Sequence, residues 1–402
     1  MRFVKMISLA ATLALSAGQA TAIENRKLYV PCGGGFADFV ARMKAEAEAM
    51  AYPPQITDPF FAEANYLQRT INADRAQGIF KTDFIDFSRK LIAQYRLDKG
   101  RQSSQQYDAI FTAIESQLGV PRGVLLSFWA FETDFGAFTG DFNTLDTLMT
   151  LSHDCRRPEL FQPQVFAALE LYARGQFDPR NQQGAWAGEV GQVQMLPMDI
   201  MERGYDGDGD GKVDLDHSAA DALYSGANML RSFGWRPNEP WMQEIVVPDT
   251  LPWEETGVAD DDFRPVAEWA AWGVTPRSGA WEGPGLDGAV MLPMGRKGPA
   301  FLIYPNYRAL FEWNQSFVYV ATAAYFATRL QGAPVYDAGN PDPSLSDGEM
   351  KALQTKLAAL GHDVGKIDGI LGSGTRKAVQ AEQVRLGLPA DAWPTRELLN
   401  RL

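Results

Sequence analysis

The chain has 402 residues, of which 46% are hydrophobic and 22% are charged, and its net charge is −13. This length predicts two or three domains with a substantial core, and the composition argues against a wholly disordered protein. The acidic balance argues against nucleic acid as a partner. The three histidines and two cysteines are too scattered for a zinc enzyme with HExxH or paired CxxC motifs.

Residues 1–22 have the pattern of a cleavable signal peptide. Arg2 and Lys5 precede an apolar stretch over residues 7–17, which is too short to span a membrane. The tripeptide ATA at positions 20–22 fits the small-x-small pattern of a cleavage site. We therefore expect an exported protein, and a buried N-terminal helix is the alternative. No later apolar run reaches about 18 residues, so no transmembrane segment is expected.

The two cysteines lie far apart in the sequence. An oxidising compartment favours disulfide formation, so export predicts a Cys32–Cys155 disulfide that ties the N-terminal segment to the body. Two buried free thiols are the alternative.

Hydrophobic spacing predicts a mainly α-helical body. Residues 35–118 have helical periodicity, and a further helix is expected to begin near Pro121, because proline is favoured in a first turn, and to stop before Gly136. Another helix is expected over residues 314–330. Between these helices, residues 236–300 hold many of the prolines and glycines together with short β-prone pieces, which predict a small sheet or insertion.

Glu132 stands out as a candidate catalytic acid. It lies near the end of the helix that begins at Pro121, and Phe128 and Trp129, four and three positions earlier, share its helical face. A carboxyl packed against aromatic rings loses hydration, which raises its pKa. Such a group can remain protonated near neutral pH and donate a proton to a glycosidic oxygen. A solvated residue at a helix end is the alternative.

An acidic loop follows in the sequence. Its first nine positions match an EF-hand, with aspartates at the first, third, fifth and ninth positions and glycine at the sixth. These aspartates are Asp206, Asp208, Asp210 and Asp214. His217 stands where a bidentate glutamate is expected. The pattern predicts a structural Ca²⁺ site, with a solvated acidic turn as the alternative, and no other cofactor is required.

The last part of the chain is predicted to be a separate module. Residues 23–331 form the expected catalytic body, and residues 332–345 hold three prolines and two glycines without periodicity, which is typical of a linker. Residues 346–402 predict three short helices, the first ending at Gly361 and the third beginning at Thr395. A core of this size is small but sufficient for a module.

Four ordered segments between residues 100 and 330 resemble the lytic murein transglycosylase B family. They are GVPRGVLLSFWAFETDFGAFTGDFNTLDTLMTLSHDCRRPELF, GAWAGEVGQVQMLPMDIMERGYDGDGDGKVDL, ANMLRSFGW and GPAFLIYPNYRALFEWNQS. The resemblance implies a lysozyme-like α+β domain with a small β insertion and an Asp-rich loop that can bind a cation. It also implies that Glu132 is the sole acid/base, that Gln194 holds the sugar, and that Trp313 and Asn314 form the family's aromatic-Asn pair.

Aromatic side chains are further candidates for the glycan cleft. Trp129, Trp186, Tyr307 and Trp313 are candidates to stack on sugar faces, and packing in the core is the alternative for each tryptophan.

Two positions depart from the family pattern. Ala185 replaces a serine that can hydrogen-bond the catalytic glutamate, and the loss of one such donor should weaken the carboxylate form by about 1 kcal/mol. Glu189 replaces a small residue and is expected to lie close to the cleft. These two departures predict a reaction rate or a substrate preference that differs from that of typical family members.

The chemistry implied by the resemblance explains why only one carboxylate is evident. An ordinary glycosidase needs two. A lytic transglycosylase uses one glutamate, here Glu132, to protonate the oxygen of the MurNAc–GlcNAc β-1,4 bond and then to deprotonate the C6 hydroxyl of MurNAc. That hydroxyl attacks C1 and forms 1,6-anhydroMurNAc. A hydrolytic muramidase and a catalytically weak wall-binding or scaffolding protein are the alternatives.

The C-terminal module is similar to type-one peptidoglycan-binding domains. The motifs L-Q-x-x-L-x-x-x-G and D-G-x-x-G-x-x-T-R-x-A-V cover residues 353–379, whereas Ala392 stands where glycine is usual. The resemblance implies a periplasmic monomer that binds peptidoglycan glycan strands, with cell-wall synthesis or division proteins as candidate partners. A purely structural cap is the alternative for this module.

Overall fold

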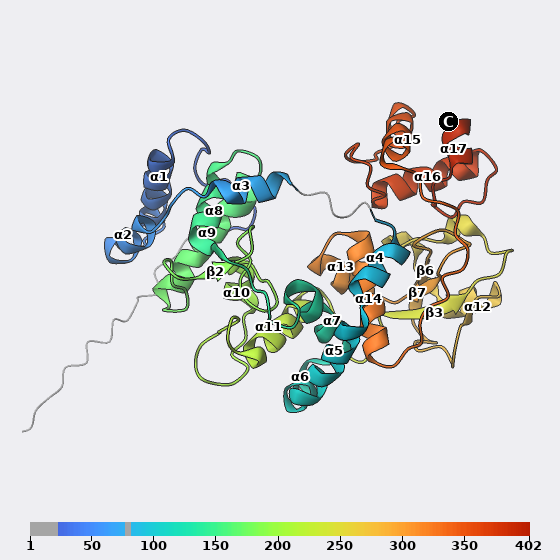
Figure 1. Cartoon of the computed structure of the whole chain (residues 1–402), viewed down its shortest axis with the longest axis horizontal. Helices are drawn as coiled ribbons and strands as arrows, with labels where there is room; N and C mark the ends of the chain where they lie inside the picture. The colour runs from blue at the N-terminus through green and yellow to red at the C-terminus, as the bar shows by residue number, and fades with distance from the viewer. Residues whose placement is uncertain (1–22, 77–81) are drawn as a thin grey trace, which may run out of the picture.

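The computed structural model describes residues 23–76 and 82–402, and the expected signal peptide lies outside the described residues. Helices dominate the architecture, with a small sheet and a C-terminal group of helices at one end (Figure 1). This agrees with the predicted mainly α fold. Within the described part of the chain, no helix is long and apolar enough to cross a membrane.

The N-terminal end of the molecule, at the left of Figure 1, is a group of helices around one core. Phe39, Phe60 and Phe166 are completely buried in it. Cys32 and Cys155 form a disulfide, which confirms the predicted pair. The helices of this region are α1 (Phe36–Ala49), α2 (Pro54–Ala62), α3 (Gln68–Arg75), α8 (Thr144–His153), α9 (Pro158–Ala173) and α10 (Pro197–Arg203).

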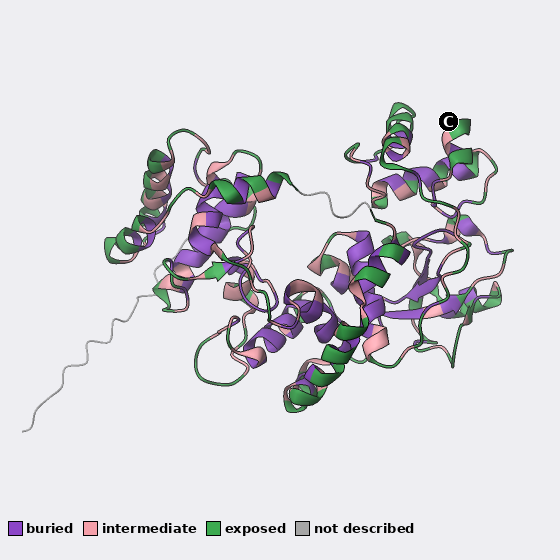
Figure 2. Ribbon diagram, in the orientation of Figure 1, coloured by how far each residue is buried: buried purple, intermediate pink, exposed green. Residues whose placement is uncertain are grey.

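The centre of the molecule is built on α7 and α14, which pack closely against each other. Every residue of α7 over 123–130 is buried, so this helix is enclosed on nearly all sides (Figure 2). The helices of this region are α4 (Phe84–Leu91), α5 (Gln94–Gln106), α6 (Asp108–Leu118), α7 (Arg122–Thr133), α11 (Ala219–Ser232), α13 (Asn306–Trp313) and α14 (Phe317–Leu330).

The helix predicted over residues 314–330 begins later than expected, at Phe317. The Asn314 side chain accepts a hydrogen bond from the backbone N–H of Ser316 at 2.9 Å. Asparagine stabilises turns through such local bonds, which compete with helix formation. The connection between α13 and α14 is therefore a turn.

A five-stranded antiparallel sheet in the order β4-β6-β7-β3-β5 confirms the predicted small β region. Its inner strands are fully buried at Val290 and Leu302, which pair with each other. A separate pair, β1 (Phe142–Asn143) and β2 (Gln183–Gly184), lies near the N-terminal helices. The sheet strands are β3 (Met242–Val246), β4 (Arg264–Pro265), β5 (Thr275–Pro276), β6 (Asp287–Met291) and β7 (Phe301–Ile303), with α12 (Val266–Ala271) and 3₁₀ turns at Trp253–Glu255 and Asp260–Asp262.

The C-terminal module has the three predicted helices, α15 (Asp347–Ala359), α16 (Ser373–Arg385) and α17 (Arg396–Arg401). Ser346 and Glu349 form a capping box that fixes the start of α15. The core of the module is formed by the completely buried side chains of Leu353, Leu357, Val379 and Leu398.

The module rests directly on the body beside the sheet. The Gln380 side chain donates hydrogen bonds to the carbonyls of Trp253 at 3.2 Å and Thr256 at 2.8 Å. The expected linker contains no helix or strand, but Tyr336 is buried in it and its hydroxyl lies 2.8 Å from that of Ser88. The connection is thus packed along the body.

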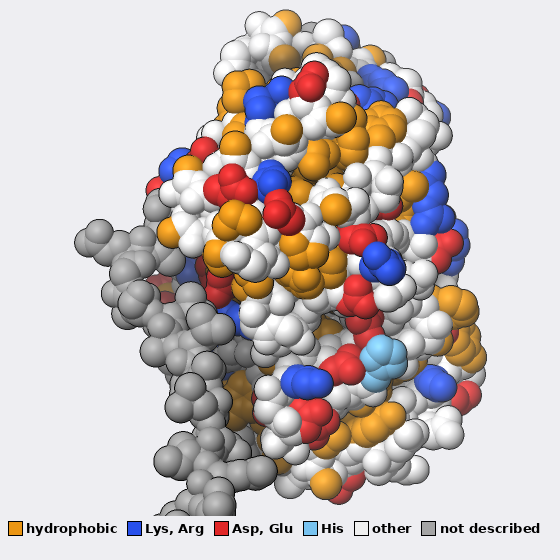
Figure 3. All heavy atoms as spheres, turned by 90° about the vertical axis from the view of Figure 1, so that its left-hand side faces the viewer, with side chains coloured by type: hydrophobic (Ala, Val, Ile, Leu, Met, Phe, Trp, Pro, Cys, Tyr) orange, Lys and Arg blue, Asp and Glu red, His pale blue; other side chains and the backbone are white. Residues whose placement is uncertain are grey.

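The N-terminal face of the molecule carries a mixed surface. Figure 3 shows acidic, basic and hydrophobic side chains interspersed over this face. Several acidic side chains lie close together beside a histidine on the lower part of this face.

Candidate active site

Glu132 lies in the last turn of α7, which ends because Asp134 takes a left-handed conformation with φ 52°. The Asp134 carboxylate turns away to Arg96, at 3.2 Å, and to the hydroxyl of Tyr95, at 2.8 Å. The two carboxyls at the end of α7 therefore have different surroundings. Asp134 is held in an ion pair, whereas Glu132 faces the aromatic groups of α13 and α14.

One oxygen of Glu132 receives two hydrogen bonds. The Tyr319 hydroxyl donates to Oε1 at 2.5 Å, and the Trp313 indole N–H donates to the same atom at 3.2 Å. Tyr319 comes from the first turns of α14 and Trp313 from the end of α13. Because a Trp N–H can only donate, Oε1 must act as the acceptor, and two donors occupy its lone pairs. A neutral Glu132 therefore carries its proton on Oε2.

The aromatic surroundings predicted for Glu132 are present, but they are arranged differently from the prediction. Phe128 stacks on Trp313 with ring centroids 4.4 Å apart, and this stack places the indole against the carboxyl. Burial raises the pKa of Glu132 to about 7, while the hydrogen bonds from Tyr319 and Trp313 oppose the rise. The nearby charge of Glu189 raises the pKa further. The predicted rise in the pKa of Glu132 is confirmed.

Glu189 is a second acidic group at this site. Burial raises its pKa, and the backbone amides of Ala187 and Glu189 oppose that rise. Its Oε2 atom is buried, with no hydrogen-bond partner among the described residues. The electrostatic effect of Glu189 on Glu132 agrees with the expected position of Glu189 close to the cleft.

Gln194 has a left-handed backbone with φ 54°, in the turn that links Val190 to Met195. Its side-chain amide donates to the carbonyls of Thr139 at 3.1 Å and Gly191 at 2.9 Å. These bonds use the amide nitrogen, so the carbonyl oxygen is the group that Gln194 can offer to a sugar hydroxyl. Its role in sugar binding stays a prediction.

The structure separates the four aromatic candidates for sugar stacking. Trp186 and Trp313 are half-buried, which leaves part of each ring available. The prediction is wrong for Trp129 and Tyr307, which are each only 2% exposed and lie in the core. The Trp129 indole donates to Gln192 at 3.2 Å inside that core. A ring enclosed in this way has no face to offer a sugar.

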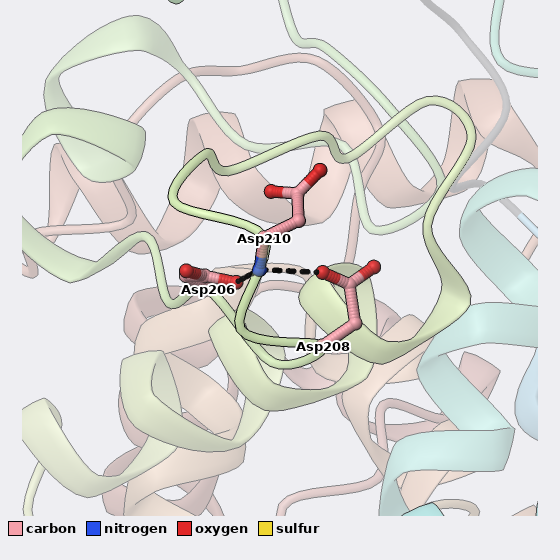
Figure 4. Close-up of side chains that lie close together, drawn as sticks. All are labelled: Asp206, Asp208 and Asp210. Carbon is pink, nitrogen blue, oxygen red and sulfur yellow. Dashed lines mark hydrogen bonds between the residues drawn. The ribbon is translucent and has the colours of Figure 1, made fainter.

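The acidic loop brings together three of its four candidate ligands. Carboxylate oxygens of Asp206, Asp208 and Asp210 lie within 4.8 Å of one another (Figure 4). Asp206 also accepts hydrogen bonds from backbone amides of the same loop, which hold its side chain inward. Asp214 lies outside this group and instead contacts His217 at 3.1 Å. The predicted four-aspartate ligand set is therefore reduced to three.

Comparisons with known proteins identify both parts of the chain. Residues 35–328 match the model of the transglycosylase SLT domain, and residues 346–402 match that of the peptidoglycan binding domain. The chain belongs to the SLT transglycosylase family. This confirms the resemblance on which Glu132, Gln194 and the Trp313-Asn314 pair were assigned.

Solved structures and a curated relative are similar to this SLT chain. SltB3 from Pseudomonas aeruginosa, solved with NAG-anhNAM-pentapeptide, is 32% identical, with a TM-score of 0.83 over 92% of this chain and 99% of its own. Membrane-bound lytic murein transglycosylase B of Escherichia coli K12 is 29% identical over 153 residues, which cover 38% of this chain and 42% of that relative. Escherichia coli Slt35, solved with calcium, shares the fold at 23% identity and a TM-score of 0.63, over 75% of this chain and 95% of its own.

Tyr319 is a residue of the candidate site that the sequence did not reveal. It lies in an apolar helix with alanines and aromatics, where a tyrosine is usually part of the core. Its contact with Glu132 joins residues 187 positions apart. In the sequence, only its place five positions after Asn314 could have indicated that Tyr319 lies at the site.

Proposed function

We propose that this protein is an exported lytic transglycosylase that cleaves the β-1,4 bond between N-acetylmuramic acid and N-acetylglucosamine in peptidoglycan. The observation that carries the proposal is the setting of Glu132, whose carboxyl accepts hydrogen bonds from Tyr319 and Trp313. Burial in this setting raises the pKa of Glu132 to about 7. A group with such a pKa can act as an acid and as a base at neutral pH. The SLT family match supports the substrate class.

The acid step uses the proton on Oε2 of Glu132. This proton passes to the glycosidic oxygen as the bond from that oxygen to C1 of the muramic acid breaks. Negative charge then develops on the carboxylate. The Tyr319 hydroxyl and the Trp313 N–H already donate to Oε1, so they stabilise this charge without rearrangement.

The base step returns the proton. Ionised Glu132 accepts the proton of the C6 hydroxyl, and the C6 oxygen bonds to C1 to form the 1,6-anhydro ring. Glu132 ends as it began, and water is not consumed. One carboxyl is enough for both steps. Asp134, the other carboxyl at the end of α7, is engaged in an ion pair with Arg96 and is not needed for the reaction.

The presence of Glu189 at the site supports a second candidate function, that of a hydrolytic muramidase. Its buried Oε2 atom has no partner among the described residues, and its charge acts on Glu132. A second carboxyl in the cleft is what a hydrolase uses to activate water or to form a glycosyl intermediate. In that reaction Glu132 would act as the acid and Glu189 as the second group.

Mass spectrometry of digested sacculi distinguishes the two reactions. Transglycosylation gives 1,6-anhydro products, and hydrolysis gives products heavier by one water. We expect anhydro products from the wild type and from Glu189→Gln, and no products from Glu132→Gln. Glu312→Gln, which replaces an exposed acid on α13, is the matched control. Digestion by Glu132→Gln at the wild-type rate would refute the catalytic assignment.

We also propose that the chain works in the periplasm as a monomer bound to peptidoglycan strands through its C-terminal module. The disulfide supports an oxidising compartment, and the module matches a peptidoglycan binding domain. Release of the protein by osmotic shock, its mass in solution and its retention on purified sacculi test these three points. Proteins of wall synthesis or division are candidate partners, to be sought by crosslinking in cells.

The acidic loop is proposed as a structural Ca²⁺ site. The cluster of Asp206, Asp208 and Asp210 fits a hard cation, since Ca²⁺ prefers carboxylate and carbonyl oxygens. Escherichia coli Slt35, a protein of the same fold, forms a complex with calcium. Calorimetry should detect Ca²⁺ binding to the full chain and to the surface variant Asp287→Asn, and no binding to Asp206→Asn. No heat from the wild type at millimolar Ca²⁺ would remove the site.

A further inference from the structure

A pocket of about 400 Å³ lies where the C-terminal module meets the body. Its walls come from the start of α4, the turn between α13 and α14, the connecting segment, and the module. This volume is in the range of ligand-binding pockets. The turn contributes Asn314, Gln315 and Ser316, so the pocket begins one residue after Trp313, whose indole donates to Glu132. The pocket is thus a neighbour of the catalytic site.

Arg376, from α16, gives the pocket a cationic group. Its guanidinium lies 4.2 Å from the ring centroid of Phe317 and 5.9 Å from that of Trp393. It donates to the carbonyl of Pro293 at 2.8 Å. Its Nε atom has no hydrogen-bond partner among the described residues, and the carboxylate that acts on its charge is that of buried Asp391. Burial lowers the pKa of Arg376 to about 10, the direction expected of a cation in an apolar setting.

Asp391 accepts hydrogen bonds from the Gln383 side chain and from the backbone amides of Arg296 and Trp393, so its carboxylate is already engaged. A buried cation without a hydrogen-bonded anion is costly, and Arg376 can therefore accept an anionic ligand. The aromatic faces of Phe317 and Trp393 supply only part of this compensation. Arginine binds carboxylates through paired N–H groups, so a carboxylate is the ligand group that best matches Arg376.

The rest of the pocket carries the opposite charge and apolar surface. Asp83 and Asp347 line it, the first capping α4 and the second paired with Lys351 at 2.9 Å. Buried Phe84 and Met350 provide apolar walls. A ligand that carries a carboxylate, an ammonium group and short aliphatic side chains matches this combination.

We propose that this pocket binds the peptide arm of a muramoyl residue, with a peptide carboxylate at Arg376 and an ammonium group toward Asp83 and Asp347. The peptides of peptidoglycan carry carboxylates, small side chains and a diamino acid. An extended arm of five residues spans about 17 Å. The pocket residues Asn314 and Val318 directly adjoin Trp313 and Tyr319, the two donors to Glu132, so we expect an arm of this length to extend from a sugar at Glu132 into the pocket. This inference rests on the proposed function and extends it from the glycan to its peptide.

The proposal assigns the module a part in substrate selection as well as in attachment to the wall. Arg376 belongs to the T-R-x-A-V motif of the module, and it meets the body at Pro293 and Phe317. Docking of the module on the body therefore completes a pocket that neither part forms alone. A transglycosylase built in this way should prefer strands that carry peptides over strands from which peptides have been removed.

The test compares glycan strands with intact peptides and the same strands stripped by an amidase, using the full chain. We expect the wild type to cleave the intact strands with the higher kcat/KM. Arg376→Met keeps the aliphatic stem and removes the charge, and it should lower the ratio of the two kcat/KM values at least fivefold. Lys377→Met, which removes an exposed cation from the same helix, should keep the wild-type ratio.

Failure of the proposed function and failure of the peptide site give different results. A wild type that cleaves neither strand contradicts the proposed function, whereas one that cleaves both strands equally contradicts only the peptide site. A loss in Arg376→Met that is equal on both strands would show that Arg376 is a structural contact and overturn the inference. Ser344→Trp, which fills the pocket from its exposed rim, should also lower the ratio and does not depend on the packing of Arg376.

Direct binding provides an independent measurement. Muramyl pentapeptide titrated into Glu132→Gln should give a calorimetric signal, and adding Arg376→Met should weaken the affinity about tenfold. Equal affinity in both proteins would refute the assignment of Arg376.

Discussion

Replacing Glu132 by glutamine should stabilise the protein at high pH and leave its stability unchanged at low pH. The amide has nearly the same shape as the carboxyl, and its oxygen can still accept the hydrogen bonds from Tyr319 and Trp313. The substitution therefore removes the ionisation of this side chain and little else. The burial that raises the pKa of Glu132 also penalises its charged form in the folded state.

The sign and size of this effect follow from the two pKa values. Below pH 4.5 the carboxyl is protonated in both the folded and the unfolded chain, so it contributes no pH dependence. As the pH rises from 4.5 to about 7, the unfolded chain releases the proton first, and the wild type loses stability. The shift of the pKa from 4.5 to about 7 corresponds to a full loss of at most about 3 kcal/mol above pH 7. Glu132 is half-buried, and its contact with water makes the loss smaller.

Urea unfolding of both proteins at pH 4, 6 and 8 measures the difference in free energy of unfolding. The difference should be close to zero at pH 4 and should reach its largest value, in favour of Glu132→Gln, at pH 8. Glu312→Gln, at an exposed position on α13, should show no such trend. A difference between wild type and Glu132→Gln that is independent of pH would refute the reasoning.

Two further substitutions test the groups around Glu132, and a third tests the disulfide. Tyr319→Phe removes a 2.5 Å hydrogen bond to the carboxylate; the pKa of Glu132 should rise, and its pH–rate profile should shift to higher pH while kcat falls about tenfold or more. Glu189→Gln removes a negative charge that raises the pKa of Glu132, so the same profile should shift to lower pH. Cys155→Ser breaks the disulfide and should cost about 2–5 kcal/mol in urea unfolding, an effect that vanishes when the wild type is reduced.

The sequence could predict the parts of the site that depend on local order. The helix around Glu132, the spacing of its aromatic neighbours and the three helices of the module are encoded over a few turns each. The assignment of Trp129 to the cleft failed because α7 is buried on nearly all sides, so helical spacing could not separate a core face from a cleft face. Phe128 and Trp129 differ by one position, and only the packing of α13 against α7 selects Phe128 as the neighbour of Trp313.

Contacts between distant segments could not be predicted from the sequence. Tyr319 reaches Glu132 across 187 positions, and the pairing depends on how α14 packs on α7. The turn at Asn314, which ends one helix and begins the next, also decides which side chains face the carboxyl. In the acidic loop, Asp214 has a regular place in the spacing, but its contact with His217 removes it from the cluster.

Glu189 and the two aromatic donors act on Glu132 in opposite directions. The negative charge of Glu189 destabilises the ionised form of Glu132 and keeps it protonated to higher pH, which favours proton donation. The donors from Tyr319 and Trp313 oppose this trend, because they stabilise the carboxylate formed when the proton leaves. The balance between these groups holds the pKa near 7, where one carboxyl can serve first as acid and then as base.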